Sequence, residues 1–360
     1  MLLNHIKVPI FFTTFLFVFI ACDNSSTGSK EDSGPIPSEN LEAVLSYTME
    51  NENGGPKGQT LLIWHDGEIL LEEYSENFDG QQLHNIWSGS KSFAGLLAAI
   101  AVQNGLFTFD TALGELIPEW NPESERGKIT IRQLLNLTSG IETASIGDTN
   151  QTAEEWLAAD MEFETGAKFT YGPTPFYILS WIFMEVFEIN PVSYLNDNLF
   201  SPLGLVRGDW SNVDLIYPNL SFGARYPALD WLQVGIMLMN KGSLNGNVII
   251  EENLLNDLLT PSETNPGYGI TFWLNTPVGQ QKRSALSLPG HAKSQSTSKM
   301  ISDLMPDDLF MMSGAFGQKL YICPSLNLVI VRYGVFLVGG ISDEQFFLRL
   351  MEGVDQNTLE

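Results

Sequence analysis

The sequence has few cysteines and few histidines. Its 360 residues include only two cysteines, Cys22 and Cys323, and four histidines. A framework of several disulfides cannot be built from two thiols, and no cluster of Cys, His and carboxylate residues has the spacing of a zinc site. We therefore expect no metal ion and no other cofactor, and we interpret Cys323, in the apolar context LYICPSL, as a small buried side chain.

Basic residues are also scarce. The chain has 18 Lys and Arg residues against 43 Asp and Glu residues, which gives a formal net charge of -25. A surface of this sign repels phosphate backbones and anionic lipid headgroups, so we expect no nucleic-acid partner. The acidity itself is typical of a charge spread over the surface for solubility rather than of an acidic functional patch.

The chain contains a long apolar run at its N terminus. The run from Val8 to Ile20 follows Lys7 and is too short for a typical bilayer span, but it has the length of a signal-peptide core. It ends in Phe-Ile-Ala-Cys, which resembles a bacterial lipobox whose cysteine, here Cys22, is lipidated. We expect an exported lipoprotein of the cell envelope, held at a membrane by Cys22. An ordinary signal peptide with an incidental cysteine and an uncleaved anchor are the alternatives.

The domain boundaries follow from composition. Residues 1–21 form the expected signal peptide, and residues 22–40 are polar and rich in Ser, Gly and Pro, which predicts a flexible tether. Residues 41–360 are long enough for one large domain, since 44% of the whole chain is hydrophobic. A short helix over about 39–51 is expected to open the domain.

The domain itself begins and ends with strand signals. The segment LLIWHDGEILLEEY places Asp66 and Gly67 between two strands, and LYICP and LNLVIVRYGVF flank a turn at 324–327. Helices are expected over 91–104, 175–188, 231–240 and 343–354, with mostly helical signals through 108–259. Hairpins at both ends with helices between them predict an α/β chain of the α+β type, whose antiparallel sheet is built from both chain ends, with flanking helices and an inserted, mainly helical lobe.

A candidate nucleophile lies at the start of the apolar helix 91–104. A spacing of three places the Lys91 amine one turn from the Ser88 hydroxyl, on the same face. A neutral lysine could take the hydroxyl proton, or a charged lysine could lower the pKa of the hydroxyl, and the Ser88 N–H could bind an oxyanion. A plain helix N-cap is the alternative for Ser88. A second Ser-x-x-Lys, Ser296 to Lys299, lies in a polar segment with no buried helix behind it and is not expected to function.

Two further clusters could complete a catalytic site. Tyr171, in FTYGP before an apolar helix, could act as a phenolate base or relay a proton as a neutral phenol, although a packing role is the alternative. Ser313, Gly314 and Ala315 precede the strand KLYIC, where small residues let a substrate lie against the backbone. The N–H of Ala315 is a candidate second oxyanion donor, and a plain glycine-rich turn is the alternative. His84 and His291 fit no motif, and we expect packing or surface roles for them.

In this order the three clusters resemble the serine hydrolases related to class C β-lactamases and penicillin-binding proteins, including the 6-aminohexanoate-dimer hydrolases and the family VIII esterases. Ser88 and Lys91 match the nucleophile motif Ser-x-x-Lys, Tyr171 matches the Tyr of Tyr-x-Asn, and Ser313-Gly314 matches the site of Lys-Thr-Gly. Segments such as ITIRQLLNLTSGIE, YGITFWLN and FGQKLYICPSLNLVIV also look like this family, so the resemblance covers about residues 61–333. It implies a β-lactamase/transpeptidase-like fold and an acyl-enzyme on Ser88.

Two departures bear on the substrate. Pro173 stands where the family has Asn, and Met312 and Ser313 stand where it has Lys-Thr. Loss of a cation at this point weakens capture of a substrate carboxylate such as that of a β-lactam. We therefore expect a small-molecule or peptide substrate with an ester or amide bond, with a D-amino-acid peptidase as an intermediate case. The alternative is a catalytically weak or inactive envelope lipoprotein of the penicillin-binding type.

Overall fold

The computed structural model describes residues 36–50, 58–145, 147–205, 208–278, 299–335 and 341–353. These residues belong to one unit, which spans residues 34–360. The expected signal peptide, Cys22 and most of the expected tether lie outside the described residues. Within the described ranges, no helix combines the length and the apolar character that crossing a membrane requires.

In chain order, the helices and strands are α1 (Ser38–Met49), β1 (Gly58–His65), β2 (Glu68–Tyr74), β3 (His84–Asn85), η1 (Trp87–Gly89), α2 (Ser90–Gln103), α3 (Leu113–Leu116), α4 (Glu125–Lys128), α5 (Ile131–Leu135), α6 (Ala153–Ala158), α7 (Thr174–Trp181), η2 (Ile182–Val186), α8 (Pro191–Leu195), η3 (Asn196–Phe200), β4 (Asp209–Trp210), β5 (Asn212–Val213), β6 (Tyr217–Pro218), β7 (Ala224–Tyr226), α9 (Ala228–Met239), β8 (Ser243–Leu244), β9 (Asn247–Val248), α10 (Glu252–Leu258), β10 (Trp273–Leu274), β11 (Phe310–Gly314), η4 (Ala315–Gly317), β12 (Gln318–Cys323), η5 (Pro324–Leu326), β13 (Leu328–Gly334) and α12 (Asp343–Glu352).

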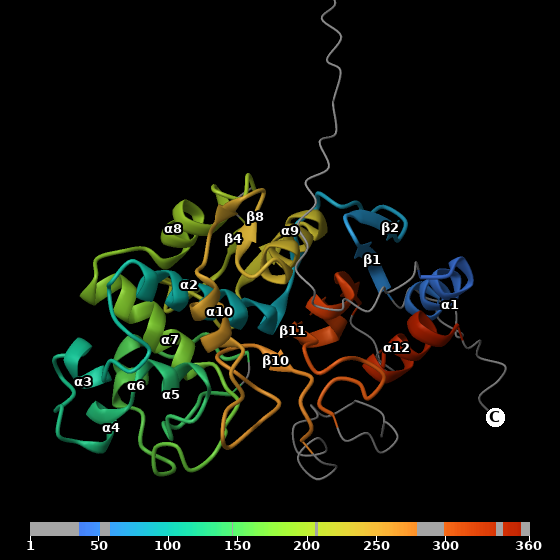
Figure 1. The fold of residues 1–360 in the computed structure, drawn as a ribbon. Coiled ribbons are helices and arrows are strands. Elements are labelled where there is room, and N and C mark those ends of the chain that lie inside the picture. The colour runs from blue at the N-terminus through green and yellow to red at the C-terminus, as the bar shows by residue number, and fades with distance from the viewer. Residues whose placement is uncertain are drawn as a thin grey trace, which may run out of the picture. The chain divides into compact units, whose positions relative to one another are not determined.

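The main sheet joins the two ends of the domain, as the sequence predicts. It has six strands in the order β10-β11-β12-β13-β1-β2, and every neighbouring pair is antiparallel. The central pair is β1 with β13, where Ile63 lies opposite Ile330. In Figure 1 the blue β1 therefore belongs to the same sheet as the orange and red strands from the end of the chain. The predicted antiparallel sheet built from both chain ends is confirmed.

Local turn chemistry sets the register of this sheet. Asp66 and Gly67 connect β1 to β2 with φ angles of 48° and 100°, the left-handed values that a tight hairpin of this kind requires. Between β12 and β13 the chain makes the turn η5, and Asn327 closes it with a φ of 44°. Both predicted hairpins are confirmed. The strand β2 forms one edge of the sheet and carries exposed glutamates, which disfavour pairing with another chain.

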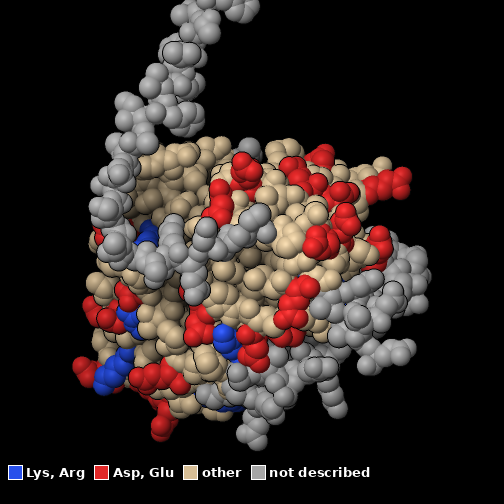
Figure 2. Space-filling model, turned by 45° about the vertical axis from the view of Figure 1, so that its right-hand side comes forward, with Lys and Arg blue, Asp and Glu red and all other residues tan. Residues whose placement is uncertain are grey.

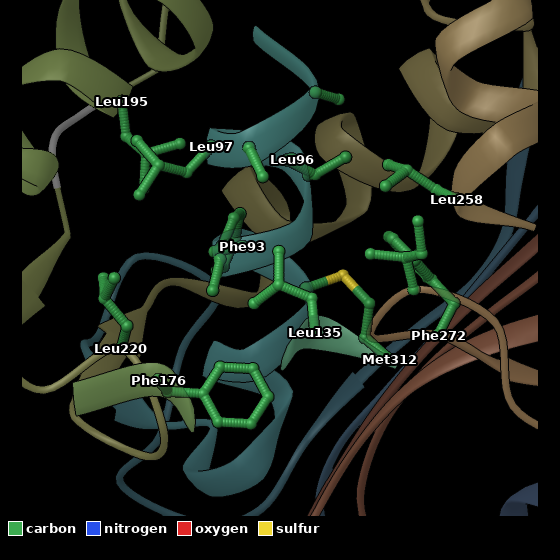
Figure 3. Packing of buried hydrophobic residues seen from close by; sticks show 14 of the residues in the cluster. Phe93, Leu96, Leu97, Leu135, Phe176, Leu195, Leu220, Leu258, Phe272 and Met312 are labelled. Atoms are coloured by element: carbon green, nitrogen blue, oxygen red, sulfur yellow. The ribbon is translucent and has the colours of Figure 1, made fainter. Parts of the chain in front are cut away.

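Each face of the sheet is covered by helices. On one face, the side chains of α2 and α9 are buried against the sheet and against the helical lobe. This lobe is the part of the chain between these two helices. Figure 3 shows Phe93, Leu96 and Leu97 of α2 among side chains of α5, α7 and α8, with Met312 of β11 in the same core. On the other face, α1 and α12 pack on β1, β12 and β13. The inserted, mainly helical lobe is thus observed as predicted.

The folded part begins slightly earlier than the sequence suggests. The helix α1 starts at Ser38, so residues 38–40 are helical rather than part of a tether ending at residue 40. Asn40 is buried, and its side-chain amide donates a hydrogen bond of 2.9 Å to the carbonyl of Leu350 at the end of α12. This contact between the chain ends, which are 310 residues apart, anchors α1.

Acidic side chains predominate over basic ones on the surface. On the face that Figure 2 shows, Asp and Glu are scattered over many elements, and few Lys or Arg lie between them. This arrangement agrees with the interpretation of the net charge as a general surface property.

A buried ionic cluster fastens α12 to the sheet. The carboxylate of Asp343 lies 3.3 Å from both Lys319 Nζ and Arg332 Nη2, and the Tyr321 hydroxyl donates to it at 2.6 Å. The Arg332 side chain has no exposed surface. Burial alone would raise the pKa of Asp343, but the two cations and the donated hydrogen bonds lower this pKa to about 2.

Replacing Asp343 with Asn should destabilise the fold by about 3–5 kcal/mol, because Lys319 and Arg332 would keep buried charges without a counter-ion. The measurement is the free energy of unfolding in urea. The matched control is Asp209→Asn, which breaks a half-exposed pair with Arg225 and should cost at most about 1 kcal/mol. Equal losses in the two variants would show that the cluster does not hold α12.

Candidate active site

Ser88 lies in a strained turn between β3 and α2. The residue before it, Trp87, has a φ of 48°, an uncommon conformation for a bulky side chain. This turn is held from both sides, because Trp87 N donates to Asn85 Oδ1 at 2.8 Å and Ser90 Oγ donates to the Trp87 carbonyl at 2.6 Å. The helix α2 starts only at Ser90, and its N-cap is Gly89, so Ser88 neither opens the helix directly nor caps it. Its hydroxyl is thereby left for other contacts.

Lys91 lies one turn after Ser88 and points back toward it. Its Nζ is 3.3 Å from Ser88 Oγ, as the three-residue spacing predicts. The same ammonium group also reaches Ser221, where it donates to Oγ at 2.7 Å and to the carbonyl oxygen at 3.0 Å. Only 3% of the Lys91 surface is exposed, and this burial lowers the pKa of its amine to about 7. At neutral pH a large share of Lys91 is therefore uncharged.

Tyr171 reaches the same place from the loop before α7. Its ring centroid is 4.9 Å from Lys91 Nζ, and its phenol oxygen is near enough to the Ser88 side chain for the two groups to interact. Burial raises the pKa of Tyr171 to about 12, although the interaction with Ser88 opposes this rise. Of the two states considered from the sequence, the structure thus favours the neutral phenol over the phenolate.

The structure brings the end of β11 against the nucleophile turn. A Cβ atom added to Gly314 would lie 2.0 Å from the carbonyl oxygen of Ile86, so only glycine permits this close approach of the two backbones. Ser313 and Gly314 end β11, whereas Ala315 begins the short turn η4 and not the strand KLYIC itself. The predicted backbone segment is therefore next to Ser88, with Ala315 in a turn.

Met312 does not line the cleft, because its side chain is fully buried in the core. A cation nevertheless approaches this position from the neighbouring strand. Lys319 lies opposite Ser313 in the β11–β12 pair, and its Nζ donates to Ser313 Oγ at 2.9 Å. It is also paired with Asp343, and burial, the largest effect on it, lowers the pKa of Lys319. Lys319 and Ser221 are contacts that no sequence motif indicated.

Aromatic side chains lie next to the candidate catalytic residues. Trp87 packs edge to face on Phe316 with ring centroids 5.2 Å apart, and Phe316 is partly exposed. On the other side, Tyr171 lies 5.7 Å from the ring of Trp273, and Phe169 joins the same group. An apolar environment of this kind strengthens the electrostatic interactions within the site.

The remaining candidates from the sequence are the second Ser-x-x-Lys and the histidines His84 and His291. Residues 296–298 of the second Ser-x-x-Lys and His291 fall outside the described residues, and Lys299 Nζ pairs with Asp307 at 2.8 Å. His84 stacks on Tyr333 at 4.4 Å, and burial lowers its pKa to about 4, as suits a packing role. In the part of the chain that is described, no group of three or more His, Cys, Asp or Glu residues could hold a metal ion.

Similarity to known proteins agrees with this geometry. A family model described as beta-lactamase matches residues 48–333. Comparison with curated protein sequences gives no significant match.

Three solved structures have related folds. A class C beta-lactamase from Rhodobacter sphaeroides has a TM-score of 0.63 at 14% identity, over 88% of this chain and 99% of that chain. EstCE1, described as a hydrolase with promiscuous acyltransferase activity, has a TM-score of 0.63 at 15% identity, over 88% and 98%. A protein assigned as a 6-aminohexanoate-dimer hydrolase, from Bacillus anthracis, has a TM-score of 0.60 at 18% identity, over 77% and 74%.

The TM-scores of these three structures show a shared β-lactamase/transpeptidase-like fold, and the family model covers most of the sequence. The resemblance seen in the three sequence clusters is thereby confirmed. The chain belongs to the beta-lactamase family of hydrolases.

Proposed function

We propose that this protein cleaves an ester or amide bond through an acyl-enzyme on Ser88. The observation that carries the proposal is the buried amine of Lys91, 3.3 Å from the Ser88 hydroxyl, with a pKa lowered to about 7. A lysine with this pKa can accept a proton near neutral pH, which an ordinary lysine cannot do efficiently. Membership of a hydrolase family supports the same conclusion.

In the first step, neutral Lys91 accepts the proton of the Ser88 hydroxyl while Oγ forms a bond to the substrate carbonyl carbon. The π electrons of the carbonyl move to its oxygen, and the resulting oxyanion would accept hydrogen bonds from backbone N–H groups. The candidates are those of Ser88 and Ala315. Gly314 supports this pairing, because it lets the end of β11 approach the nucleophile turn.

In the second step, the bond between the carbonyl carbon and the leaving group breaks, and the leaving group needs a proton. Tyr171 is a neutral phenol that contacts Ser88, so it can pass a proton to the leaving group and regain one from the Lys91 ammonium. Water then attacks the acyl-enzyme with the same groups acting in reverse. The products are the acid, the leaving alcohol or amine, and free Ser88.

The surroundings of Ser88 favour uncharged acyl donors over β-lactams. Met312 is buried and presents no charge to the cleft, and Pro173 offers no side-chain amide. Among the described residues, Lys319 brings a cation to Ser313, and its ammonium is engaged by Asp343 and by Ser313 itself. A substrate carboxylate would have to compete with these partners. The aromatic rings of Trp87 and Phe316 instead suit an apolar acyl group.

A fluorophosphonate probe should form one covalent adduct, on Ser88, and Ser88→Ala should reduce labelling to background because the attacking oxygen is gone. The measurement is intact mass followed by peptide mapping. The control is Ser193→Ala, an exposed serine on α8, which should label like the natural protein.

Absence of labelling in the natural protein would favour the inactive, penicillin-binding type of lipoprotein instead. A fluorescent penicillin carries a carboxylate and should acylate Ser88 poorly. Rapid and complete acylation by the penicillin would contradict the preference for uncharged donors.

The kcat/KM for a neutral ester should fall about tenfold per pH unit below about pH 7, because only uncharged Lys91 can accept the Ser88 proton. The sign follows from the direction of the shift, since burial lowers the pKa of Lys91 and protonation below that value removes the base. The measurement is the pH profile of kcat/KM at constant ionic strength.

Lys91→Arg should lower kcat/KM by roughly 10²- to 10⁴-fold, since a guanidinium stays protonated throughout this range. The matched control is Lys241→Arg, at an exposed lysine paired with Glu252, which should leave the profile unchanged. A profile that is flat across about pH 6 to 8 would exclude Lys91 as the base.

A further inference from the structure

Ser221 contacts Lys91 through two oxygen atoms. It lies in the loop between β6 and β7 and is fully buried. Its hydroxyl accepts a hydrogen bond from Lys91 Nζ at 2.7 Å, and its carbonyl oxygen accepts another at 3.0 Å. Both distances are shorter than the 3.3 Å from the same nitrogen to Ser88 Oγ.

The loop that carries Ser221 is fixed to the nucleophile segment. Asn219 Oδ1 accepts from the backbone N–H of Ser221 at 3.1 Å, which sets the turn. Three residues after Ser221, Ala224 N donates to Ser90 Oγ at 2.9 Å, and Ile86 N donates to the Ala224 carbonyl at 3.1 Å. The position of Ser221 relative to Ser88 is therefore set by hydrogen bonds on both sides of the nucleophile turn.

Hydrogen-bond counting shows what this contact does to Lys91. A charged ammonium has three N–H donors, and three acceptors are present: Ser88 Oγ and the two oxygens of Ser221. A neutral amine keeps two N–H groups and gains one electron pair. If the two N–H groups stay on Ser221, the electron pair faces the Ser88 hydroxyl, which is the orientation a base needs.

The other groups around Lys91 do not compete for this role. The rings of Tyr171 and Phe176 lie with centroids 4.9 and 5.1 Å from Nζ, and both are uncharged at neutral pH. In the described part of the chain, no carboxylate forms an ion pair with Lys91. The pKa of Lys91 is lowered because the amine is buried away from water. Among the described residues, the hydrogen bonds of the Lys91 amine therefore go to Ser88 and Ser221.

We propose that Ser221 is a positioning residue that directs the electron pair of Lys91 at the Ser88 hydroxyl. This inference rests on the proposed function, in which Lys91 is the base for Ser88. Ser221 touches neither the substrate carbonyl nor the leaving group in this scheme and acts through Lys91.

Ser221→Ala tests the inference with two readouts. The rate of phosphonylation of Ser88 should fall by roughly 10- to 100-fold, because one N–H loses its acceptor and the amine can rotate away. The titration midpoint of Lys91, followed by NMR of the chain labelled with nitrogen-15 in its lysine side chains and assigned with Lys91→Met, should move to lower pH. The ammonium form loses an acceptor in this variant, and so it is disfavoured.

Two further variants separate positioning from packing. Ser221→Thr keeps the hydroxyl and should restore most of the phosphonylation rate. Ser180→Ala removes another fully buried serine hydroxyl, on α7, for which the described residues provide no hydrogen-bond partner, and it should change neither readout.

The outcomes distinguish this inference from the proposed function. If Ser221→Ala keeps both the phosphonylation rate and the Lys91 midpoint of the natural protein, the positioning role is overturned while the hydrolase proposal stands. If the natural protein is not phosphonylated on Ser88 but the midpoint still moves in Ser221→Ala, the hold of Ser221 on Lys91 is supported and the hydrolase proposal fails.

Discussion

The proposed chemistry of this protein depends on a lysine amine that is buried and has no carboxylate partner among the described residues. Lys91 is almost completely enclosed, and its hydrogen-bond acceptors are the uncharged oxygens of Ser88 and Ser221. Burial of a charged ammonium is costly unless an opposite charge compensates it, so the amine tends to give up its proton. Lys319 illustrates the contrast, since it is largely enclosed but has Asp343 beside it. The same residue type thus serves as a candidate base in one place and as a structural cation in the other.

The fold provides this environment by joining distant parts of the chain. The apolar helix α2 passes through the core between the sheet and the helical lobe, with Lys91 in its first turn and Ser88 in the short turn η1 just before it. Tyr171 comes from the loop before α7, and Ser221 comes from the loop before β7. The end of β11 closes the remaining side at Gly314, where two backbones nearly touch. Each wall of the site comes from an element whose position is set by packing rather than by its neighbours in sequence.

Much of this arrangement could be predicted from the sequence, because it depends on residues close together in the chain. The contacts that could not be predicted join residues far apart in the chain. The contact between Ser88 and Lys91 is local in sequence. A separation of three residues in a helical turn is enough to bring the two side chains together. The hairpins at Asp66-Gly67 and at Asn327 are also local, since left-handed turn residues signal them. Ser221 carries no motif, and its contact with Lys91 spans 130 residues, so only the folded chain reveals it. Lys319 could have been found by counting residues across the β11–β12 hairpin, because it pairs with Ser313. The position of Ala315 in a turn depends on the irregular backbone around Phe316, which the sequence does not indicate.

The central claim is that Ser88, Lys91 and Tyr171 form one reactive centre with the backbone at Ala315. The most direct test is a crystal structure of the protein after reaction with a small uncharged phosphonate. The account predicts phosphorus bonded to Ser88 Oγ, with the phosphoryl oxygen accepting from the N–H groups of Ser88 and Ala315 and with Lys91 Nζ still on Ser221. A phosphonate bonded to a different residue, or an oxygen on Ser88 that points into solvent away from both N–H groups, would contradict it.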